Sequence, residues 1–177
     1  MTTLYVDNIA PNLQSRVSVP GHVIQVVQAV KTDVQSFTSV TYTDVTGLSA
    51  SITPSSTSNK ILVLMHMHHG SDTGIGGFRL VRGATPIHVG DASGSCTQAT
   101  GGLGYGVSAD NNSAYYAGLV SAVQYLDSPS TTSSTTYKVQ IMDANGGNTY
   151  VNRAGYDSNN SASMRGTSSI TLMEIAG

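Results

Sequence analysis

The sequence contains little charge. Of its 177 residues, 10% are Asp, Glu, Lys or Arg, and Glu174 is the single glutamate. That share is less than half of the usual one, so Ser, Thr, Asn and Gly must form much of the surface. The formal net charge of −2 comes from scattered residues, which leave no basic face to bind phosphates. We therefore expect no nucleic-acid partner.

Cysteine and long apolar runs are scarce as well. Cys96 is the single cysteine, so a disulfide within the chain is excluded and stability must come from packing or association. No apolar run approaches the length of a membrane span, and the first residues lack the basic and apolar regions of a signal peptide. We expect no membrane insertion and no export address.

Strand-forming residues dominate what is present. Val, Ile and Thr are abundant, nine Tyr occur, and helical stretches rich in Ala, Leu, Glu and Lys are missing. About ten strand-like segments at regular spacing predict an all-β fold, an antiparallel β-sandwich of the jelly-roll-like kind. We expect residues 1–19 to form a short extended N-terminal arm and linker, and residues 20–177 to form the sandwich.

Two segments have the same order of residue types. In residues 51–63 and again in residues 126–141, a strand-like run stops at a proline, passes through Ser and Thr, and resumes through a lysine. Proline removes a ladder donor and Ser/Thr side chains stabilise turns, so both segments predict strand, loop, strand. Residues 82–85 and Asn145-Gly146 predict hairpins, and residues 90–112 predict the longest loop region.

The run His22–Val30 is apolar on both faces. A strand that is buried on both sides needs two neighbours, which favours either a seam between subunits or a central strand of the fold. Val23, Ile24, Val26 and Val27 are the candidate residues for the subunit interface.

The run Val45–Val63 resembles a segment of tail-fibre-like virion structural proteins from cyanophages and other marine tailed phages. Further short segments agree with this resemblance in their order and spacing, namely residues 20–27, 79–83, 125–132, 136–138 and 170–177. The resemblance thus extends from Pro20 to Gly177. It implies a non-enzymatic virion protein, often trimeric, that is made in the host cytoplasm and located in the virion.

The N-terminal run Leu4–Ile9 also resembles the leader of such proteins. This resemblance implies that the run docks to other virion proteins. Leu4, Tyr5, Val6 and Ile9 are the candidate anchoring residues, because an edge strand adds main-chain hydrogen bonds to apolar contacts. Many tail-fibre proteins carry a long shaft between anchor and tip, whereas fewer than 20 residues separate this run from the sandwich. A compact adhesin on the tail, or a capsid decoration protein, suits this length at least as well as a tail fibre does.

Two histidines are the weak candidates for a metal site. His66 and His68 share one face of the expected strand, where neutral imidazoles can meet a metal ion. No carboxylate or cysteine adjoins them. Packed or hydrogen-bonded histidines are therefore the preferred interpretation, and we expect no cofactor.

Catalytic motifs are weak throughout the chain. Asp72-Thr73-Gly74 matches the core of the aspartic protease motif but lacks the apolar strand that leads into it, which favours a glycine-rich turn. Glycoside cleavage by a tail-associated depolymerase needs two acidic residues across a sugar site, and no spacing selects such a pair. We expect no enzymatic activity.

Three polar loops are candidates for contact with a host glycan or receptor, because Tyr offers contact area at low entropy cost and Asn offers adaptable hydrogen bonds. Solvated turns favour the same residue types, so that alternative stays open. The candidate residues are Asn111, Asn112, Tyr115, Tyr116, Asn145, Tyr156 and Asn159.

Overall fold

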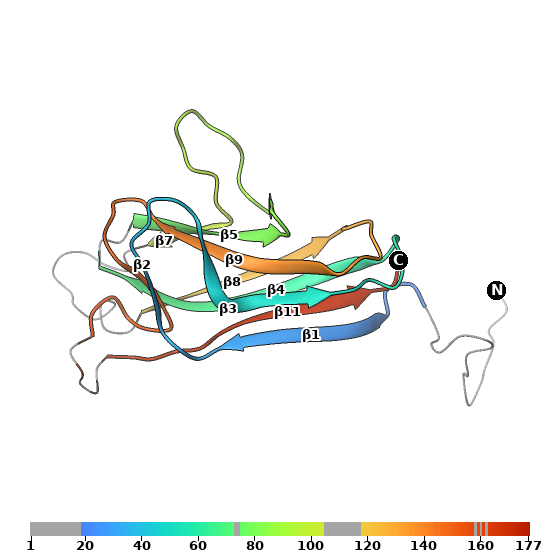
Figure 1. Ribbon diagram of the computed structural model, residues 1–177, viewed down its shortest axis with the longest axis horizontal. Coiled ribbons are helices and arrows are strands. Elements are labelled where there is room, and N and C mark those ends of the chain that lie inside the picture. The colour runs from blue at the N-terminus through green and yellow to red at the C-terminus, as the bar shows by residue number, and fades with distance from the viewer. Residues whose placement is uncertain (1–18, 73–74, 105–117, 158, 160, 162) are drawn as a thin grey trace, which may run out of the picture.

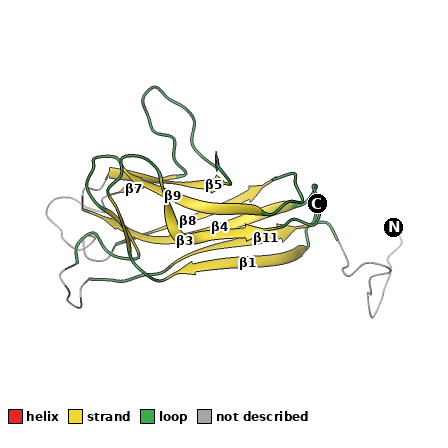
Figure 2. Ribbon diagram, in the orientation of Figure 1, coloured by secondary structure: helices red, strands yellow, loops and turns green. Residues whose placement is uncertain are grey.

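The computed structural model describes residues 19–72, 75–104, 118–157, 159, 161 and 163–177. Eleven strands and no helix occur in these residues (Figure 2). The strands pair antiparallel in two sheets that lie against each other (Figure 1). The expected all-β sandwich is thus confirmed. Residues 1–18 of the expected arm, with Leu4, Tyr5, Val6 and Ile9, lie outside the described residues.

Sheet A is built around the longest strand. Its strands lie in the order β1 (Val23–Lys31), β11 (Ser168–Ile175), β4 (Lys60–Ser71) and β8 (Leu119–Asp127). At one end of β4, β10 (Thr149–Val151) takes the place of β11, and β2 (Gln35–Phe37) pairs with β10.

Sheet B forms the other layer. It contains β3 (Thr43–Ile52), β9 (Thr135–Asp143) and β5 (Ile75–Arg82) in this order. β6 (Thr85–Ile87) and β7 (Gly101–Gly104) pair with successive parts of β5. The loop between β6 and β7 projects away from the sandwich (Figure 1), and it closes at its base through a Gly90 N to Ala99 O hydrogen bond of 3.0 Å.

The core lies between the sheets and follows the two-residue period of the strands. In β4, Ile61, Val63, Met65 and Met67 are buried, while the residues between them point to the other face of the sheet. β9 adds three buried residues, Tyr137, Val139 and Ile141. Each fully buried aliphatic side chain contributes roughly 1.5–3 kcal/mol, so these alternating rows hold the layers together.

The strand, loop, strand expectation is confirmed for both Ser/Thr-Pro segments. The first loop joins β3 to β4, and the second joins β8 to β9. Each loop passes between the sheets, the first from sheet B to sheet A and the second in the opposite direction. The expected hairpin at residues 82–85 is also confirmed, because Arg82 pairs with Thr85 and Gly83 has φ of 60°.

The hairpin predicted at Asn145-Gly146 is wrong. β9 belongs to sheet B and β10 to sheet A, so the chain changes layer at this turn. The Asp143 carboxylate explains the shape of the turn, since Oδ1 accepts from Asn145 N at 3.0 Å and Gly147 N at 2.9 Å. A side chain, and not a strand ladder, closes this turn.

Two further expectations are corrected. The segment 37–45 has residue types that predict a single half-exposed strand, but Phe37 ends β2, residues 43–45 begin β3, and residues 38–42 lie between them. Residues 101–104, expected as loop, form β7 beside β5. Glycine is needed there, because a Cβ on Gly101 would lie 2.6 Å from the Phe78 ring. A strand of such small residues has no apolar alternation by which to recognise it.

β4 passes very close to a neighbouring segment at Gly70. A Cβ on Gly70 would lie 2.3 Å from Gly155 N and 2.5 Å from Ala154 C, both backbone atoms. We predict that Gly70→Ala lowers the free energy of unfolding by about 3 kcal/mol, because backbone cannot yield as a side chain does. Gly90→Ala is the matched control, since its nearest non-neighbouring atom would lie 3.9 Å away. Urea denaturation of both variants measures the difference, and equal stability would contradict the packing argument.

Candidate functional site

The outer face of sheet A carries seven apolar and five polar side chains, and no Asp, Glu, Lys or Arg, over three successive rows. The cross-strand register defines these rows. The first row contains Val26, Met173, Leu62 and Leu126. The second contains Gln28, Thr171, Leu64 and Gln124. The third contains Val30, Ser169, His66 and Ala122. We call these twelve residues the outer face of sheet A.

The first row of this face, which we call the ridge, consists of four large apolar side chains, of which Val26 is 55% and Leu126 is 47% exposed. Beside it lies a hollow of about 380 Å³ over the second and third rows, where Ser169 and Ala122 are short. The wall and floor of the hollow include Leu64, His66, Gln124 and Thr171. A ridge and a hollow therefore lie side by side on one uncharged surface.

The outer face of sheet B is chemically different. Lys138 Nζ binds Asp44 Oδ2 at 2.7 Å, and Gln140 Nε2 donates to Asp44 Oδ1 at 2.6 Å. Both hydrogen bonds lower the pKa of the Asp44 carboxyl below its ordinary value. Arg79 donates from Nε to Gln140 Oε1 at 2.8 Å and stacks over the Tyr42 ring at 4.1 Å. This paired, charged network is typical of a solvated face.

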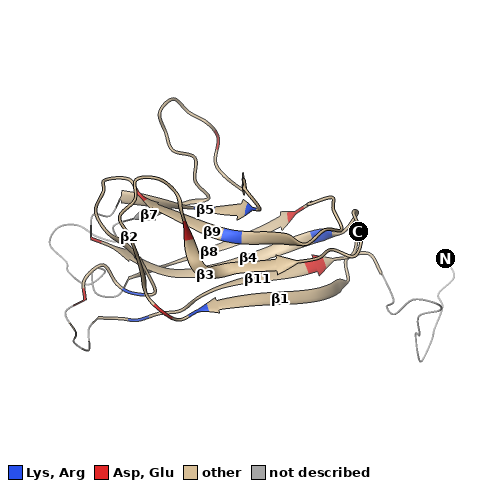
Figure 3. Ribbon diagram, viewed as in Figure 1, with Lys and Arg blue, Asp and Glu red and all other residues tan. Residues whose placement is uncertain are grey.

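Figure 3 shows the same contrast along the ribbons. The middle parts of β1, β4 and β8 carry no charged residue, whereas β3 and β9 carry charge within the sheet. Within the described residues, β1 pairs only with β11 and β8 only with β4. Exposed strand edges are usually protected by Lys, Pro or a bulge, because they pair readily with other chains. β8 contains neither Lys nor Pro.

The predicted interface residues divide between two environments. Val23 and Val26 are 41% and 55% exposed, Ile24 is half-buried, and Val27 packs against the core. β1 is an edge strand among the described residues, so it is not the central strand that the sequence also allowed. Of the four, Val26 lies on the outer face of sheet A.

The two candidate metal ligands lie on the outer side of β4. His66 is exposed and belongs to the outer face of sheet A. His68 is covered, because glycine backbone packs on its ring and a Cβ on Gly166 would lie 2.4 Å from its Cγ. Among the described residues, no group of three His, Cys, Asp or Glu side chains is arranged to hold a metal ion.

His69, which the sequence analysis did not single out, faces the core. It is 2% exposed, and its Nε2 lies 2.9 Å from Ser121 Oγ. Burial, reinforced by the neighbouring His68, lowers the pKa of His69 from 6.5 to about 4. Its Nδ1 is buried without a hydrogen-bond partner among the described residues. His69 is thus neutral at physiological pH.

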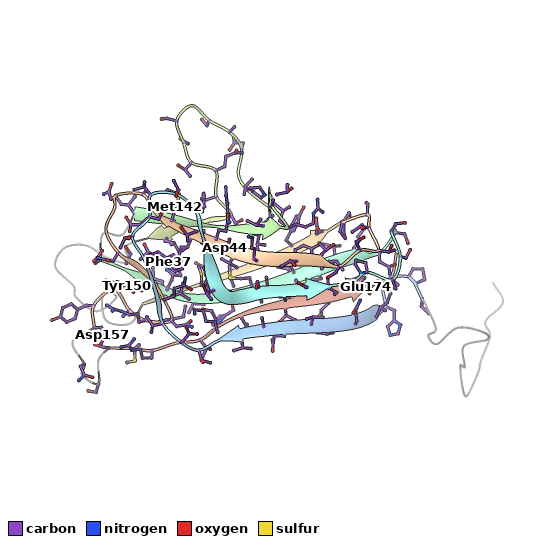
Figure 4. All side chains as sticks on the ribbon, in the orientation of Figure 1. Phe37, Asp44, Met142, Tyr150, Asp157 and Glu174 are labelled. Atoms are coloured by element: carbon purple, nitrogen blue, oxygen red, sulfur yellow. The ribbon has the colours of Figure 1, made fainter. Side chains whose placement is uncertain are left out.

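A buried carboxylate holds the first Ser/Thr-Pro loop in place. Glu174 Oε1 accepts from Ser55 N at 2.6 Å, Ser55 Oγ at 2.8 Å and Asn59 Nδ2 at 2.5 Å. Its Oε2 accepts from Gln25 Nε2 at 2.5 Å. Burial alone would raise the pKa of Glu174, but these donors outweigh it and the pKa is lowered. The single glutamate therefore ties the loop to β1 and β11, at the end of the sandwich opposite Phe37 (Figure 4).

A second buried carboxylate does the same for the second loop. Asp127 is 4% exposed at the end of β8, where the loop begins. It accepts from Arg82 Nη1 at 2.9 and 2.8 Å and from the Tyr137 hydroxyl at 2.6 Å. Burial and this hydrogen bond raise the pKa of Tyr137. No sequence pattern identified Glu174 or Asp127, because their partners are distant in the chain.

The candidate contact loops are described in part. Asn145, Tyr156 and Asn159 are exposed, with Tyr156 at 41%. Asp157 Oδ1 accepts from Asn159 N at 3.3 Å, and Asn159 has φ of 54°. Asn111, Asn112, Tyr115 and Tyr116 lie outside the described residues. The structure therefore brings Asn145 into one turn and Tyr156 and Asn159 into another.

No helix among the described residues is long and apolar enough to cross a membrane. A comparison of the chain with protein-family models and with curated proteins finds no match.

Proposed function

We propose that this chain is a non-enzymatic structural protein of a tailed-phage virion, in which the sandwich projects outward as a homotrimer and the N-terminal arm docks to other virion proteins. The proposal is supported mainly by one observation: the residues that carry the resemblance form a continuous part of the fold. The run Val45–Val63, which resembles tail-fibre-like proteins, coincides with most of β3, the carboxylate-bound loop and the start of β4. The resemblance thus covers one structural unit.

The strand order supports a more specific fold, a jelly roll. Most strands that are neighbours in each sheet are distant in sequence, as in β1–β11–β4–β8 and β3–β9–β5, whereas β5 and β6 form a hairpin. Such interleaving of strands between two packed sheets is characteristic of jelly rolls, which are frequent in viral capsid proteins and lectins. The fold thereby favours a structural or binding role in a virion.

The most favoured role is a tail-fibre or adhesin component for host attachment. The turn that carries Asn145 is held by Asp143, so its polar side chain is presented on a preorganised backbone. Preorganisation reduces the entropy cost of binding a glycan or receptor. Tyr156 and Asn159 provide a second exposed polar turn.

A capsid decoration protein is the second candidate. It is favoured by the small number of residues in the sequence between the run Leu4–Ile9 and β1. Quantitative mass spectrometry of purified virions separates the two roles. A tail component is expected in few copies per virion, and antibodies against it block adsorption. A decoration protein is expected in hundreds of copies, and its loss weakens heads. Absence of the chain from purified virions would contradict the proposed function itself.

Removal of residues 1–18 tests the docking arm. The core residues that the structure describes lie between Phe37 and Ala176, so the truncated protein is expected to keep its cooperative unfolding and its mass in solution. Its incorporation into virions is expected to be lost, because the docking contacts of Leu4, Tyr5, Val6 and Ile9 are missing. Virion proteomics after complementation measures incorporation. Normal incorporation of the truncated chain would show that another surface docks.

A further inference from the structure

The outer face of sheet A has the chemistry of a covered surface. Three of its large apolar side chains, at the outer strands β1 and β8, are about half exposed: Val26 at 55%, Val30 at 56% and Leu126 at 47%. They flank half-buried Leu62, Leu64 and Met173 on the strands between. Val26, Met173, Leu62 and Leu126 form one apolar row across the four strands, and an exposed apolar surface of this kind marks a site of association. The opposite face of the same sandwich, with its paired charges, shows no such patch in the described residues.

We propose that a second copy of this chain covers the outer face of sheet A, so that subunits meet through these twelve residues. This inference rests on the homotrimer of the proposed function and identifies its contact surface. The surface is broader than the β1 residues alone, because it includes β11, β4 and β8.

Charge favours a copy of the same chain as the partner. None of the twelve residues is Asp, Glu, Lys or Arg. When a surface meets copies of itself, any charge faces a like charge unless the geometry offsets it, so an uncharged face is suited to self-association. A strongly charged partner would find no opposite charge in these three rows.

Shape favours the same partner. The ridge of Val26, Met173, Leu62 and Leu126 lies beside the hollow around Leu64 and His66. The ridge of one subunit can enter the hollow of the next, and the ridge of that subunit can enter the hollow of the third. Such a head-to-tail contact closes into a ring when the rotation between subunits fits. The edge of β8, which contains neither Lys nor Pro, is then near a neighbouring subunit, and this reduces the risk that the open edge pairs with other chains.

Labelling of an introduced cysteine measures whether the face is covered without disturbing the assembly. In a Cys96→Ser background, Ala122→Cys places a thiol on the face, and Ser49→Cys places one at an exposed position of sheet B. We expect Ala122→Cys to react with a maleimide at least about tenfold more slowly, because the centre of an interface excludes water. Equal rates would overturn the proposal.

Charge insertion tests the same surface by mass. Val26→Lys with Leu126→Lys places unpaired charges at both ends of the ridge, and both side chains point away from the core. We expect the wild-type protein to sediment at three times its 18.3 kDa and the double variant to associate at least about 30-fold more weakly. Val40→Lys is the matched control, since Val40 is equally exposed at 58% outside sheet A, and it should keep the wild-type mass.

Circular dichroism and thermal unfolding of the double variant show whether it has kept its fold. A folded double variant with the wild-type mass would overturn the proposal, as would a monomeric wild-type protein. A protected Ala122→Cys in a monomer would overturn it too, because the chain's own N-terminal segment would then be the cover. A dimer that the double variant dissociates would support the surface and contradict the trimer. All these measurements use purified protein, so they are independent of whether the chain occurs in virions.

Discussion

Glu174→Ala is expected to lower the free energy of unfolding by about 3 kcal/mol. The carboxylate accepts four hydrogen bonds, from Ser55 N, Ser55 Oγ, Asn59 Nδ2 and Gln25 Nε2. A hydrogen bond to a charged group contributes about 1.5–3 kcal/mol, and a buried donor left unpaired costs a similar amount. Alanine removes the acceptor and leaves these donors at the end of the sandwich.

The loss is expected to be local in its structural consequences. The first Ser/Thr-Pro loop should exchange its amide protons faster in Glu174→Ala, whereas the second loop, held by Asp127, should be unchanged. Asp91→Asn is the control, because Asp91 is an exposed acid in the loop between β6 and β7. Chemical denaturation with hydrogen exchange measures both effects. A stability loss below that of the control would show that water replaces the carboxylate.

The pH dependence of Glu174 has a defined sign. Because its pKa is lowered in the folded state, the stabilisation is fully present above the ordinary pKa of 4.5 and is lost as the pH falls through the folded-state value. The contribution of Glu174 to acid sensitivity is therefore confined to pH values below about 4.5.

We also expect the free energy of unfolding to fall in mild acid because of His69. Folding lowers the pKa of His69 from 6.5 to about 4, so between these values the unfolded chain binds a proton that the folded chain does not. Stability is then complete above pH 6.5 and falls as the pH falls towards 4. We expect the free energy of unfolding to be about 2 kcal/mol lower at pH 5 than at pH 8.

His69→Gln isolates this contribution. Glutamine is neutral and keeps a polar group within reach of Ser121, so the variant is expected to fold and to lose most of the difference between pH 8 and pH 5. Urea denaturation at the two pH values is the measurement. A carboxylate whose pKa is lowered in the folded state is still ionised at pH 5, so it contributes little to the change in stability between pH 8 and pH 5. The measurement therefore separates His69 from Glu174. An unchanged pH dependence in His69→Gln would assign the effect to another group.

The parts of the fold that could be predicted from the sequence are those encoded by neighbouring residues. The strand character of β1 and β4, the Gly83 turn and both Ser/Thr-Pro loops depend on residue type, positive φ or proline, and the structure confirms them. The expected burial of β1 on both sides is wrong, because exposed and half-buried residues alternate along most of this strand. β7 was missed because glycine gives no apolar signal. The Asn145 turn was assigned to a hairpin because turn residues do not reveal which sheet receives the next strand.

Contacts between distant residues were not predictable in the same way. Asn152 is fully buried with φ of 66°, and its side chain donates to Lys31 O and Asp33 O at 2.9 Å each. Glu174 and His69 likewise take their roles from residues far away in the chain. A polar residue in a strand or loop does not by itself specify whether it is solvated or satisfied in the interior.

The sequence by itself determined an all-β chain of low charge, with two proline-ended loops and a resemblance to phage virion proteins. Only the tertiary structure decided that Val26, Met173, Leu62 and Leu126 form one ridge, and that Asp44, Lys138 and Arg79 lie together on the opposite face. The physical reason is register. Each strand places alternate residues on one face, but which residues of other strands lie beside them depends on pairing across up to about 150 residues of chain.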